Sequence, residues 1–290
     1  MNILNTLLDF IAPRFCTVCG KRLMQSEKVV CTSCLLDLNI SEYYKAAEGN
    51  TLERTMWQML PIQRAAAFLT YECNSEQRNI VLDLKYHNQP RIGYHLGMLM
   101  ASQLQEKGFF DSIDIIIPIP IPRNRKIYRG YNQSEQLAIG ISKTIGLPIN
   151  TKAIKRLPYK TSQTHLTATE RGENVKDTFM LRKNRAAALQ NKHILLIDDV
   201  ITTTATIRAC GQILSDIPGI KISVLSLAVS KNLISNIRKS NPLLPDNAPR
   251  MVPDNAPKIG SDNTPEIGSD NTPEVFPDNA HEIEPDNPMR

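Results

Sequence analysis

Apolar runs and amphipathic segments alternate through the middle of the chain, and this alternation predicts an α/β fold. Four apolar stretches predict β-strands, at residues 65–71, 113–117, 193–197 and 222–227. The runs at 113–117 and 193–197 are apolar except for Asp114 and His193, which is typical of strands covered on both faces. Four amphipathic segments predict helices, at residues 76–87, 91–105, 134–145 and 205–214. Strands that alternate with helices favour a parallel sheet with right-handed crossovers.

The segments around this core divide the chain into zones. Apolar residues recur at helical spacing near the start, at Ile3, Leu4, Leu7, Leu8 and Ile11. Pro13 ends that predicted helix. A short helix is expected around Met56 and Trp57. We therefore expect an N-terminal helix with a cysteine module at 1–40, a connector at 41–62, the α/β domain at 63–235 and a tail at 236–290.

The tail is a tandem repeat. The pair Asp-Asn recurs every eight residues, at 246, 254, 262, 270, 278 and 286, and ten of the chain's nineteen prolines lie at 241–290. Bulky apolar residues are scarce there, so burial cannot offset the entropy lost on ordering, and disorder is expected. Calcium-binding β-solenoids also place Asp at fixed spacing, but their repeats are glycine-rich nonapeptides. A tandem expansion without a biochemical role is the favoured interpretation.

Charge is distributed unevenly. Residues 241–290 hold three Lys/Arg and ten Asp/Glu, a net of −7, whereas the first 240 residues carry a net of +12. A basic body suits phosphates or nucleic acid as partners, although the same charge also serves solubility alone. No apolar run reaches the ~18 residues of a membrane-spanning helix. Asp9 interrupts the apolar start and no basic segment precedes it, so we expect a cytoplasmic protein without membrane insertion.

Four cysteines have the spacing of a metal site. Cys16-x2-Cys19 and Cys31-x2-Cys34 are separated by eleven residues, and Gly20 suits a tight turn after the first pair. Structural zinc takes four ligands in a tetrahedron, and two Cys-x2-Cys pairs supply four thiolates. A pair of disulfides is the alternative, which cytosolic redox conditions disfavour. With four protein ligands the expected zinc ion is structural. Cys73 and Cys210 have no partners at metal spacing and are expected to be buried.

The segment after the predicted strand at 193–197 has the features of a phosphate site. Asp198 and Asp199 follow the strand, and residues 202–206 (Thr-Thr-Thr-Ala-Thr) open the next helix. Unpaired amide groups and the partial positive charge at a helix start suit a phosphate, and paired carboxylates suit two adjacent ribose hydroxyls. Ligands of open α/β sheets bind at this edge. An ordinary strand-to-helix turn with an Asp/Thr cap is the alternative.

This segment resembles the phosphoribosyl pyrophosphate (PRPP) motif of type I phosphoribosyltransferases. The resemblance implies that Asp198 and Asp199 bind the ribose hydroxyls, that Thr202, Thr203, Thr204, Ala205 and Thr206 hold the 5′-phosphate, and that Mg²⁺ accompanies PRPP. Thr204 stands where the family has glycine. Because a β-branched residue at positive φ is strained, either the loop keeps negative φ at Thr204 or phosphate affinity is reduced.

Further motifs make the resemblance more specific. They are Pro118-Ile-Pro-Ile-Pro122, then Arg123-x-Arg125, Arg129-Gly-Tyr-Asn-Gln-Ser134, and Lys160-Thr-Ser-Gln-Thr164 before Arg171 and Asn174. In this order, and with the cysteine module, they resemble the ComF family, also called ComFC or GntX-like, over residues 1–230. The resemblance implies a zinc-ribbon-like module joined to a phosphoribosyltransferase-like domain. It also implies a role in DNA uptake during natural transformation, with DNA-uptake proteins as partners.

The basic residues around 123–131 allow three interpretations. Arg123, Arg125, Lys126 and Arg129 are interleaved with Tyr128 and Tyr131. Such a cluster suits pyrophosphate, or single-stranded DNA whose bases stack on the tyrosines, or is a solvated loop. The stretch with Lys160, Gln163, Thr164 and Arg171 is expected to act as a lid over PRPP. Lys85 and Tyr86 end a helix near the sheet edge and are expected to lie on the surface.

These observations leave three functions open. One is a phosphoribosyltransferase that transfers the ribosyl group from PRPP–Mg²⁺ to an acceptor by positioning and electrostatics. The second is a single-stranded-DNA-binding competence protein that retains the fold without catalysis. The third is a scaffold. A true amidophosphoribosyltransferase is disfavoured, because Cys16 belongs to the metal pattern and the chain does not begin with a cysteine nucleophile.

Overall fold

The computed structural model describes residues 13–45, 49–158, 178–182 and 186–233. The chain divides into two compact units, residues 1–255 and 256–290, and every described residue belongs to the first. The helix expected at 1–12 and the tail expected at 236–290 lie outside the described residues. No helix among those described is long and apolar enough to cross a membrane.

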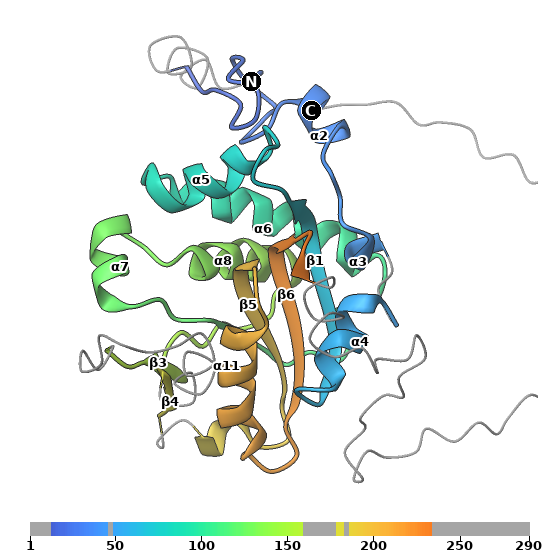
Figure 1. The fold of residues 1–290 in the computed structure, drawn as a ribbon, viewed down its shortest axis with the longest axis vertical. Helices are drawn as coiled ribbons and strands as arrows, with labels where there is room; N and C mark the ends of the chain where they lie inside the picture. Colours follow the sequence, from blue (N-terminus) through green and yellow to red (C-terminus); the bar gives the residue numbers. More distant parts are fainter. Residues whose placement is uncertain (1–12, 46–48, 159–177, 183–185, 234–290) are drawn as a thin grey trace, which may run out of the picture. The chain divides into compact units, whose positions relative to one another are not determined.

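A four-stranded parallel sheet forms the centre of the first unit (Figure 1). Its strands are β1 (Ile62–Tyr71), β2 (Ile115–Pro118), β5 (His193–Ile201) and β6 (Lys221–Ser230). They lie in the order β1-β6-β5-β2, and every neighbouring pair is parallel. The four strands are the four that the apolar runs predicted, so the α/β class is confirmed.

Helices lie between and beside the strands. They are α2 (Thr32–Leu36), α3 (Glu42–Lys45), α4 (Thr51–Trp57), α5 (Arg78–Tyr86), α6 (Pro90–Gln105), α7 (Arg123–Arg129), α8 (Gln133–Ile145), α11 (Ala205–Ser215) and the 3-10 helix η2 (Ala187–Leu189). The helices expected from amphipathic spacing appear as α5, α6, α8 and α11, and the expected connector helix appears as α4.

Two apolar clusters pack on the sheet. In one, Leu84 of α5, Met100 of α6 and Leu137 of α8 pack together with residues of the strands. In the other cluster, Met56 of α4 and Leu214 of α11 pack together with other residues of the strands. The sheet is therefore covered by helices on both faces, as expected for a parallel sheet whose strands are mostly apolar.

Helices α6 and α8 approach each other closely because glycines line their contact. A Cβ atom at Gly140 would collide with the Tyr94 carbonyl oxygen, and one at Gly97 would collide with the Leu137 carbonyl oxygen. Gly93 faces α8 as well, where an added Cβ would lie 2.8 Å from the Gln136 Cβ. The absence of side chains at these positions lets the two helix backbones meet.

The outer edge of β1 is hydrogen-bonded to the segment that follows the cysteine module. Ser41 N–H donates to the Phe68 carbonyl at 2.8 Å, and Thr70 N–H donates to the Asn39 carbonyl at 3.0 Å. The pairing is antiparallel. The side chain of Gln77, the N-cap residue of α5, also accepts from Asn39 N–H at 2.8 Å. These bonds attach residues 39–41 to the sheet.

Two elements differ from the sequence expectations. Strands β3 (Ile154–Arg156) and β4 (Phe179–Leu181) form a small antiparallel sheet that three-residue runs did not predict. Arg156 covers the Phe179 ring, with 4.9 Å between the guanidinium carbon and the ring centroid. Residues 123–129, for which the sequence left a solvated loop open, form helix α7.

Candidate functional site

The acid pair lies where strand β5 runs past its neighbour β2. Strand β5 continues through Asp198 and Asp199 to Ile201, so the expected strand end at residue 197 was wrong. The β2 ladder ends at the pair Pro118 and Ile197, while β6 still pairs with β5 beyond it. Asp198 is therefore the first β5 residue past the end of β2, at the carboxyl edge where open α/β sheets bind ligands.

Hydrogen bonds to the backbone fix both carboxylates. Asp199 N–H donates to Asp198 Oδ1 at 2.9 Å, and Val200 N–H donates to Asp199 Oδ1 at 2.7 Å. The Asp199 Oδ2 atom lies 3.3 Å from Lys85 Nζ of α5. Each acid thus has one oxygen held by an amide of the next residue. Lys85, expected on the surface, instead belongs to the site.

Burial changes the chemistry of Asp198. Withdrawal from water, together with the charge of adjacent Asp199, raises the pKa of the Asp198 carboxyl to about 7, although Lys85 acts in the opposite direction. Near neutral pH the Asp198 carboxyl therefore keeps its proton in part of the molecules, and in those molecules the pair carries one negative charge. A ligand that donates hydrogen bonds or brings positive charge favours the fully ionised pair.

The threonine turn leads into α11 as the sequence predicted. Thr202 and Thr203 are exposed, and Thr204, Ala205 and Thr206 are half-buried. Thr204 is the N-cap residue of α11 and makes no side-chain cap, so its hydroxyl does not occupy the helix amides. Amide groups at a helix start have no intrahelical partner and suit an anion.

The φ angle of Thr204 decides between the two alternatives for this position. Its φ is −78° and its ψ is −4°, so the residue lies in the right-handed region. The Thr204 hydroxyl donates to the Met59 sulfur at 3.2 Å, and the Thr204 carbonyl accepts from Arg208 N–H at 2.8 Å. Threonine is therefore accommodated without the strain that positive φ would cause.

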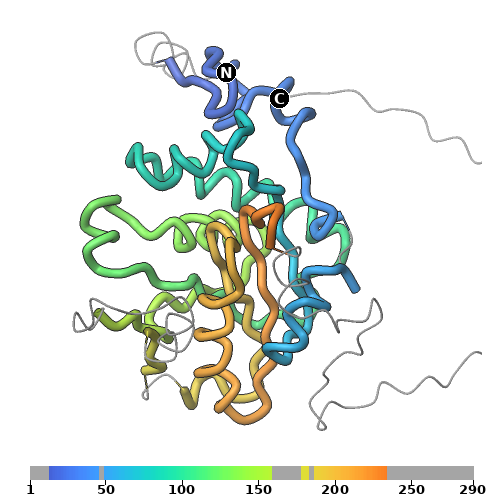
Figure 2. Tube along the Cα trace, viewed as in Figure 1, coloured from blue at the N-terminus to red at the C-terminus, as the bar shows by residue number. Residues whose placement is uncertain are grey.

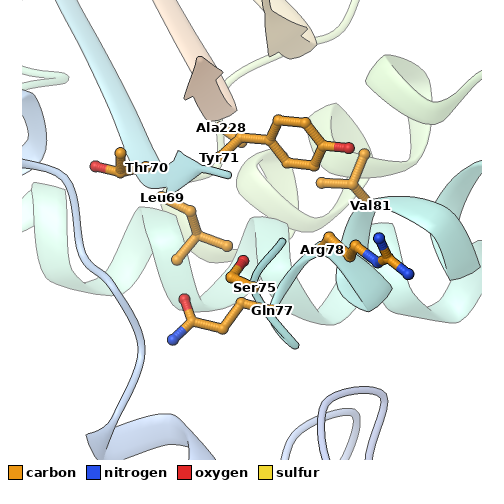
Figure 3. Close-up of a pocket in the computed structure, with 8 residues that line it drawn as sticks. All are labelled: Leu69, Thr70, Tyr71, Ser75, Gln77, Arg78, Val81 and Ala228. Carbon is orange, nitrogen blue, oxygen red and sulfur yellow. The ribbon is translucent and has the colours of Figure 1, made fainter. Parts of the chain in front are cut away.

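Two cavities lined by described residues open near the carboxyl edge, and neither is lined by the acid pair. Figure 3 shows the first, at the end of β1, lined by Leu69, Thr70, Tyr71, Ser75, Gln77, Arg78, Val81 and Ala228. The second has a volume of about 610 Å³ including its open mouth and is lined by Pro118, Pro120, Ile121, Lys126, Asn132, Glu135, Thr151 and Lys152. This second cavity lies at the end of β2, whose last residue, Pro118, is part of its lining.

Helix α7 presents most of the basic cluster to solvent. None of its residues is buried, and Arg123, Arg125 and Lys126 are exposed. Tyr128 is 79% exposed and the neighbouring Ile127 is 74% exposed. An exposed aromatic ring beside cations is the arrangement that binds single-stranded nucleic acid.

The remaining members of the cluster are held within the fold. Arg129 Nη1 donates to Gln133 Oε1 at 3.0 Å, and its guanidinium lies over the Tyr86 ring, 5.4 Å from the centroid. Tyr131 is 7% exposed, and its hydroxyl donates to the Leu84 carbonyl at 2.6 Å. Tyr131 is thus unavailable for stacking, contrary to the sequence interpretation. The expected lid residues Lys160, Gln163, Thr164 and Arg171 lie outside the described residues.

The four-cysteine cluster has the geometry of a zinc site. The sulfur atoms of Cys16, Cys19, Cys31 and Cys34 all lie within 4.8 Å of one another. The Cys19 and Cys31 sulfurs are 3.8 Å apart, close to the separation of about 3.8 Å that tetrahedral Zn–S bonds of about 2.3 Å impose. Gly20, with φ 70°, donates its N–H to the Cys16 carbonyl at 2.9 Å and makes the predicted turn.

The backbone favours thiolate at Cys16, whereas burial and the neighbouring thiols raise the pKa of Cys34. Burial raises the pKa of Cys16, but hydrogen bonds from backbone amides, including Cys31 N–H at 3.3 Å, outweigh it and lower the pKa to about 7. All six cysteines are free thiols, so the disulfide alternative is absent from the described residues. Cys210 is buried as expected, whereas Cys73 is exposed, contrary to expectation.

Comparison with known proteins gives relatives named for competence and for DNA utilization. No protein-family model matches the chain. Competence protein F of Haemophilus influenzae is 31% identical over 152 residues, which are 51% of this chain and 66% of that protein. DNA utilization protein YhgH of Escherichia coli is 25% identical over 202 residues, 69% of this chain and 83% of that protein. These relatives confirm the resemblance to the ComF family.

Solved structures similar to the chain are distant. The allosteric regulatory enzyme of purine biosynthesis gives a TM-score of 0.33 at 15% identity, over 49% of this chain and 29% of that chain. Adenine phosphoribosyltransferase from Leishmania tarentolae gives 0.32 at 11% identity, over 64% of this chain and 90% of that chain. Scores of this size add nothing to the fold assignment, which rests on the parallel sheet and its helices.

Proposed function

We propose that this relative of the ComF family binds PRPP with Mg²⁺ at residues 198–206 and acts in DNA uptake. The observation that carries the proposal is the sequence of an acid pair, a threonine turn and a helix start at one sheet edge. Asp198 and Asp199 would accept hydrogen bonds from the ribose hydroxyls. The free amides of α11, with the hydroxyls of Thr202 and Thr203, would hold the 5′-phosphate. DNA uptake is assigned from the names of two relatives, Competence protein F and DNA utilization protein YhgH, which are 31% and 25% identical to the chain over the matched residues.

The proposed site also suits transfer of the phosphoribosyl group. In such a reaction the bond from the anomeric carbon to pyrophosphate breaks, and an acceptor nucleophile forms the new bond and loses a proton. Bound Mg²⁺ would supply positive charge to the departing pyrophosphate. The acid pair would lie beside the bound ribose and would stabilise positive charge on the ring in the transition state.

Titration calorimetry of the full chain with PRPP and Mg²⁺ tests this function. We expect saturable binding that weakens at least tenfold when Asp198 and Asp199 are both changed to Asn. Asp216→Asn is the matched control, because Asp216 is an exposed acid that follows α11 at its far end. Absence of PRPP binding by the unaltered chain contradicts the proposal. Release of pyrophosphate with an acceptor mixture separates transfer from binding alone.

For the cysteine cluster we propose a structural zinc ion. Four thiolates from one chain close the coordination sphere, which leaves no position for a substrate. Residues of the module pack into the same apolar cluster as α5, since Cys16, Leu23 and Val30 share it with Val81. The ion would thereby hold the module in the shape that covers this helix.

Binding of single-stranded nucleic acid by α7 is the second candidate function. The exposed Tyr128 ring and the exposed cations Arg123, Arg125 and Lys126 favour it. Fluorescence anisotropy with a labelled oligothymidine at increasing salt tests it. The Arg125→Ala/Tyr128→Ala variant is expected to bind about tenfold more weakly and with a shallower salt dependence.

Arg129 is unsuited to this test, because its contacts with Gln133 and Tyr86 make a loss of binding ambiguous. Lys143→Ala, which removes an exposed cation from α8, is the control. Equal binding by the double variant and the control contradicts the candidate.

A further inference from the structure

Lys85 occupies the oxygen of Asp199 that the backbone leaves open. Asp199 Oδ1 already accepts from Val200 N–H at 2.7 Å. Its Oδ2 lies 3.3 Å from Lys85 Nζ, and the two side chains are 21% (Lys85) and 15% (Asp199) exposed. A ligand hydroxyl that bonds to Asp199 Oδ2 must therefore share or replace the Lys85 contact.

The position of Lys85 is fixed from its own side of the contact. It lies in the last turn of α5, next to Leu84, which is fully buried. The Leu84 carbonyl accepts from the Tyr131 hydroxyl at 2.6 Å, and Tyr86 on the other side carries the Arg129 guanidinium over its ring. These contacts keep the backbone of Lys85 beside the acid pair whether or not Asp199 holds the ammonium group.

The phosphate groups of a bound ligand would give the Lys85 ammonium group a new partner once it leaves Asp199. A ligand that combines ribose hydroxyls with phosphate groups brings several negative charges to a site that already holds two carboxylates. A lysine ammonium group is a flexible point charge with three donors, which can follow such a ligand within the reach of its four-carbon stem. Charge-assisted hydrogen bonds to phosphate are about twice as strong as neutral ones.

We propose that Lys85 is a ligand-binding residue that exchanges partners, held by Asp199 in the free protein and by the diphosphate group of the ligand in the complex. The proposal rests on the function proposed above and adds a residue to it. Lys85 thereby restrains the acid pair before binding and neutralises the diphosphate afterwards. It is a positioning residue for the ligand and takes no part in bond formation.

Two ligands that differ in the diphosphate group test the exchange. PRPP with Mg²⁺ and ribose 5-phosphate are each titrated against the unaltered chain, Lys85→Met and Lys85→Arg. For Lys85→Met we expect PRPP affinity to fall by about 10–100-fold, the size of one lost charge-assisted contact. Ribose 5-phosphate affinity should stay the same or rise, because its hydroxyls no longer compete with an ammonium group. Lys85→Arg should retain PRPP affinity within about threefold, since it keeps the charge.

Lys192→Met is the matched control. Lys192 forms an ion pair of similar length with Asp114, 3.4 Å, at the amino end of β5, and its loss should change neither affinity. Equal losses for the two ligands in Lys85→Met would show a structural role and overturn the exchange, as would no loss for PRPP. Thermal melts identify a variant that fails to fold, and Lys85→Arg then carries the comparison. If the unaltered chain binds neither ligand, the proposed function itself is wrong and the exchange falls with it.

Discussion

The hydroxyl of Thr204 donates a hydrogen bond to the sulfur of Met59, and this contact joins the threonine turn to the residues that follow α4. Thr204 has ordinary negative φ, so the position does not need the glycine that the resemblance implied. The contact supplies a physical reason for a side chain here.

Replacement of Thr204 by glycine should therefore cost stability without improving binding. We expect Thr204→Gly to lower the free energy of unfolding by about 0.5–1 kcal/mol through added chain entropy and the lost contact. PRPP affinity should change by less than about threefold, as long as the loop conformation is kept. Urea denaturation and calorimetry measure the two quantities. Thr204→Ser, which keeps the hydroxyl, is the control, and a tenfold gain in affinity for Thr204→Gly would contradict the interpretation.

The parts of the site that sequence could predict are those that are adjacent in the chain. The acid pair and threonines were visible because Asp198, Asp199 and residues 202–206 are consecutive and follow a buried run. Lys85 was misjudged because its contact depends on how α5 packs on the sheet. Tyr131 was expected to stack on bases because several cations lie close to it in the sequence. In the structure its hydroxyl bonds to the Leu84 carbonyl instead.

Secondary structure was predictable where apolar periodicity was long. The runs that became β2 and β5 needed no other information, because all of their positions except Asp114 and His193 are apolar. Helix α7 buries no residue, so no apolar stripe marked it. Strands β3 and β4 are three residues long, too short for an alternating pattern to stand out.

The acid pair gives a pH dependence whose direction follows from the raised pKa of Asp198. A carboxyl that holds its proton more tightly in the folded chain stabilises it at low pH, and that stabilisation is lost as pH rises from about 4 to about 7. Asp198→Asn removes this loss, so the variant should melt higher than the unaltered chain at pH 8, with a smaller difference at pH 5. Scanning calorimetry across this range measures the difference.

Because His193 also contributes to the pH dependence of stability, the Asp198→Asn variant must be compared with the unaltered chain at each pH. Burial lowers the pKa of His193 to about 4, which increases stability as pH rises towards the ordinary histidine value and so opposes Asp198. His193 is present in both proteins, so its contribution cancels when their melting temperatures are subtracted at each pH. A difference that does not change between pH 5 and pH 8 would contradict the raised pKa of Asp198.

Ligand binding should show the opposite trend. Because the ribose hydroxyls require an acid pair that accepts hydrogen bonds, PRPP affinity should increase between pH 6 and pH 8 as Asp198 loses its proton. Calorimetry in buffers of different ionisation enthalpy should detect the release of a proton at pH 6. Affinity that is constant over this range would separate binding from the ionisation of Asp198.

The cysteine cluster should hold one zinc ion per chain. We expect Cys34→Ser to lower zinc content to a small fraction of this and to lower the melting temperature, because metal binding contributes to folding. Elemental analysis of the purified protein measures the metal. Cys73→Ser, which removes an exposed thiol outside the cluster, should keep full zinc content. A metal-free protein with four fewer titratable thiols would indicate disulfides instead.

The close contact of α6 and α8 should not tolerate a methyl group. Gly140→Ala places a Cβ against the Tyr94 carbonyl, so we expect a loss of about 1–3 kcal/mol in the free energy of unfolding. Ile139→Ala, on the exposed side of the same helix, should change stability much less. Denaturant titration compares the two variants, and equal effects would argue against close backbone packing.

Residues 39–41 determine how the α/β domain behaves when the cysteine module is removed. Strand β1 is ten residues long and has β6 as its neighbour in the sheet, while its other edge bonds to this segment. A fragment that begins at the strand would present unpaired amide and carbonyl groups, which recruit strands from other molecules. Residues 39–41, which follow the cysteine module, thus pair with the edge of β1 and prevent self-association through it. Cutting the module away to study the α/β domain alone would yield an aggregating fragment.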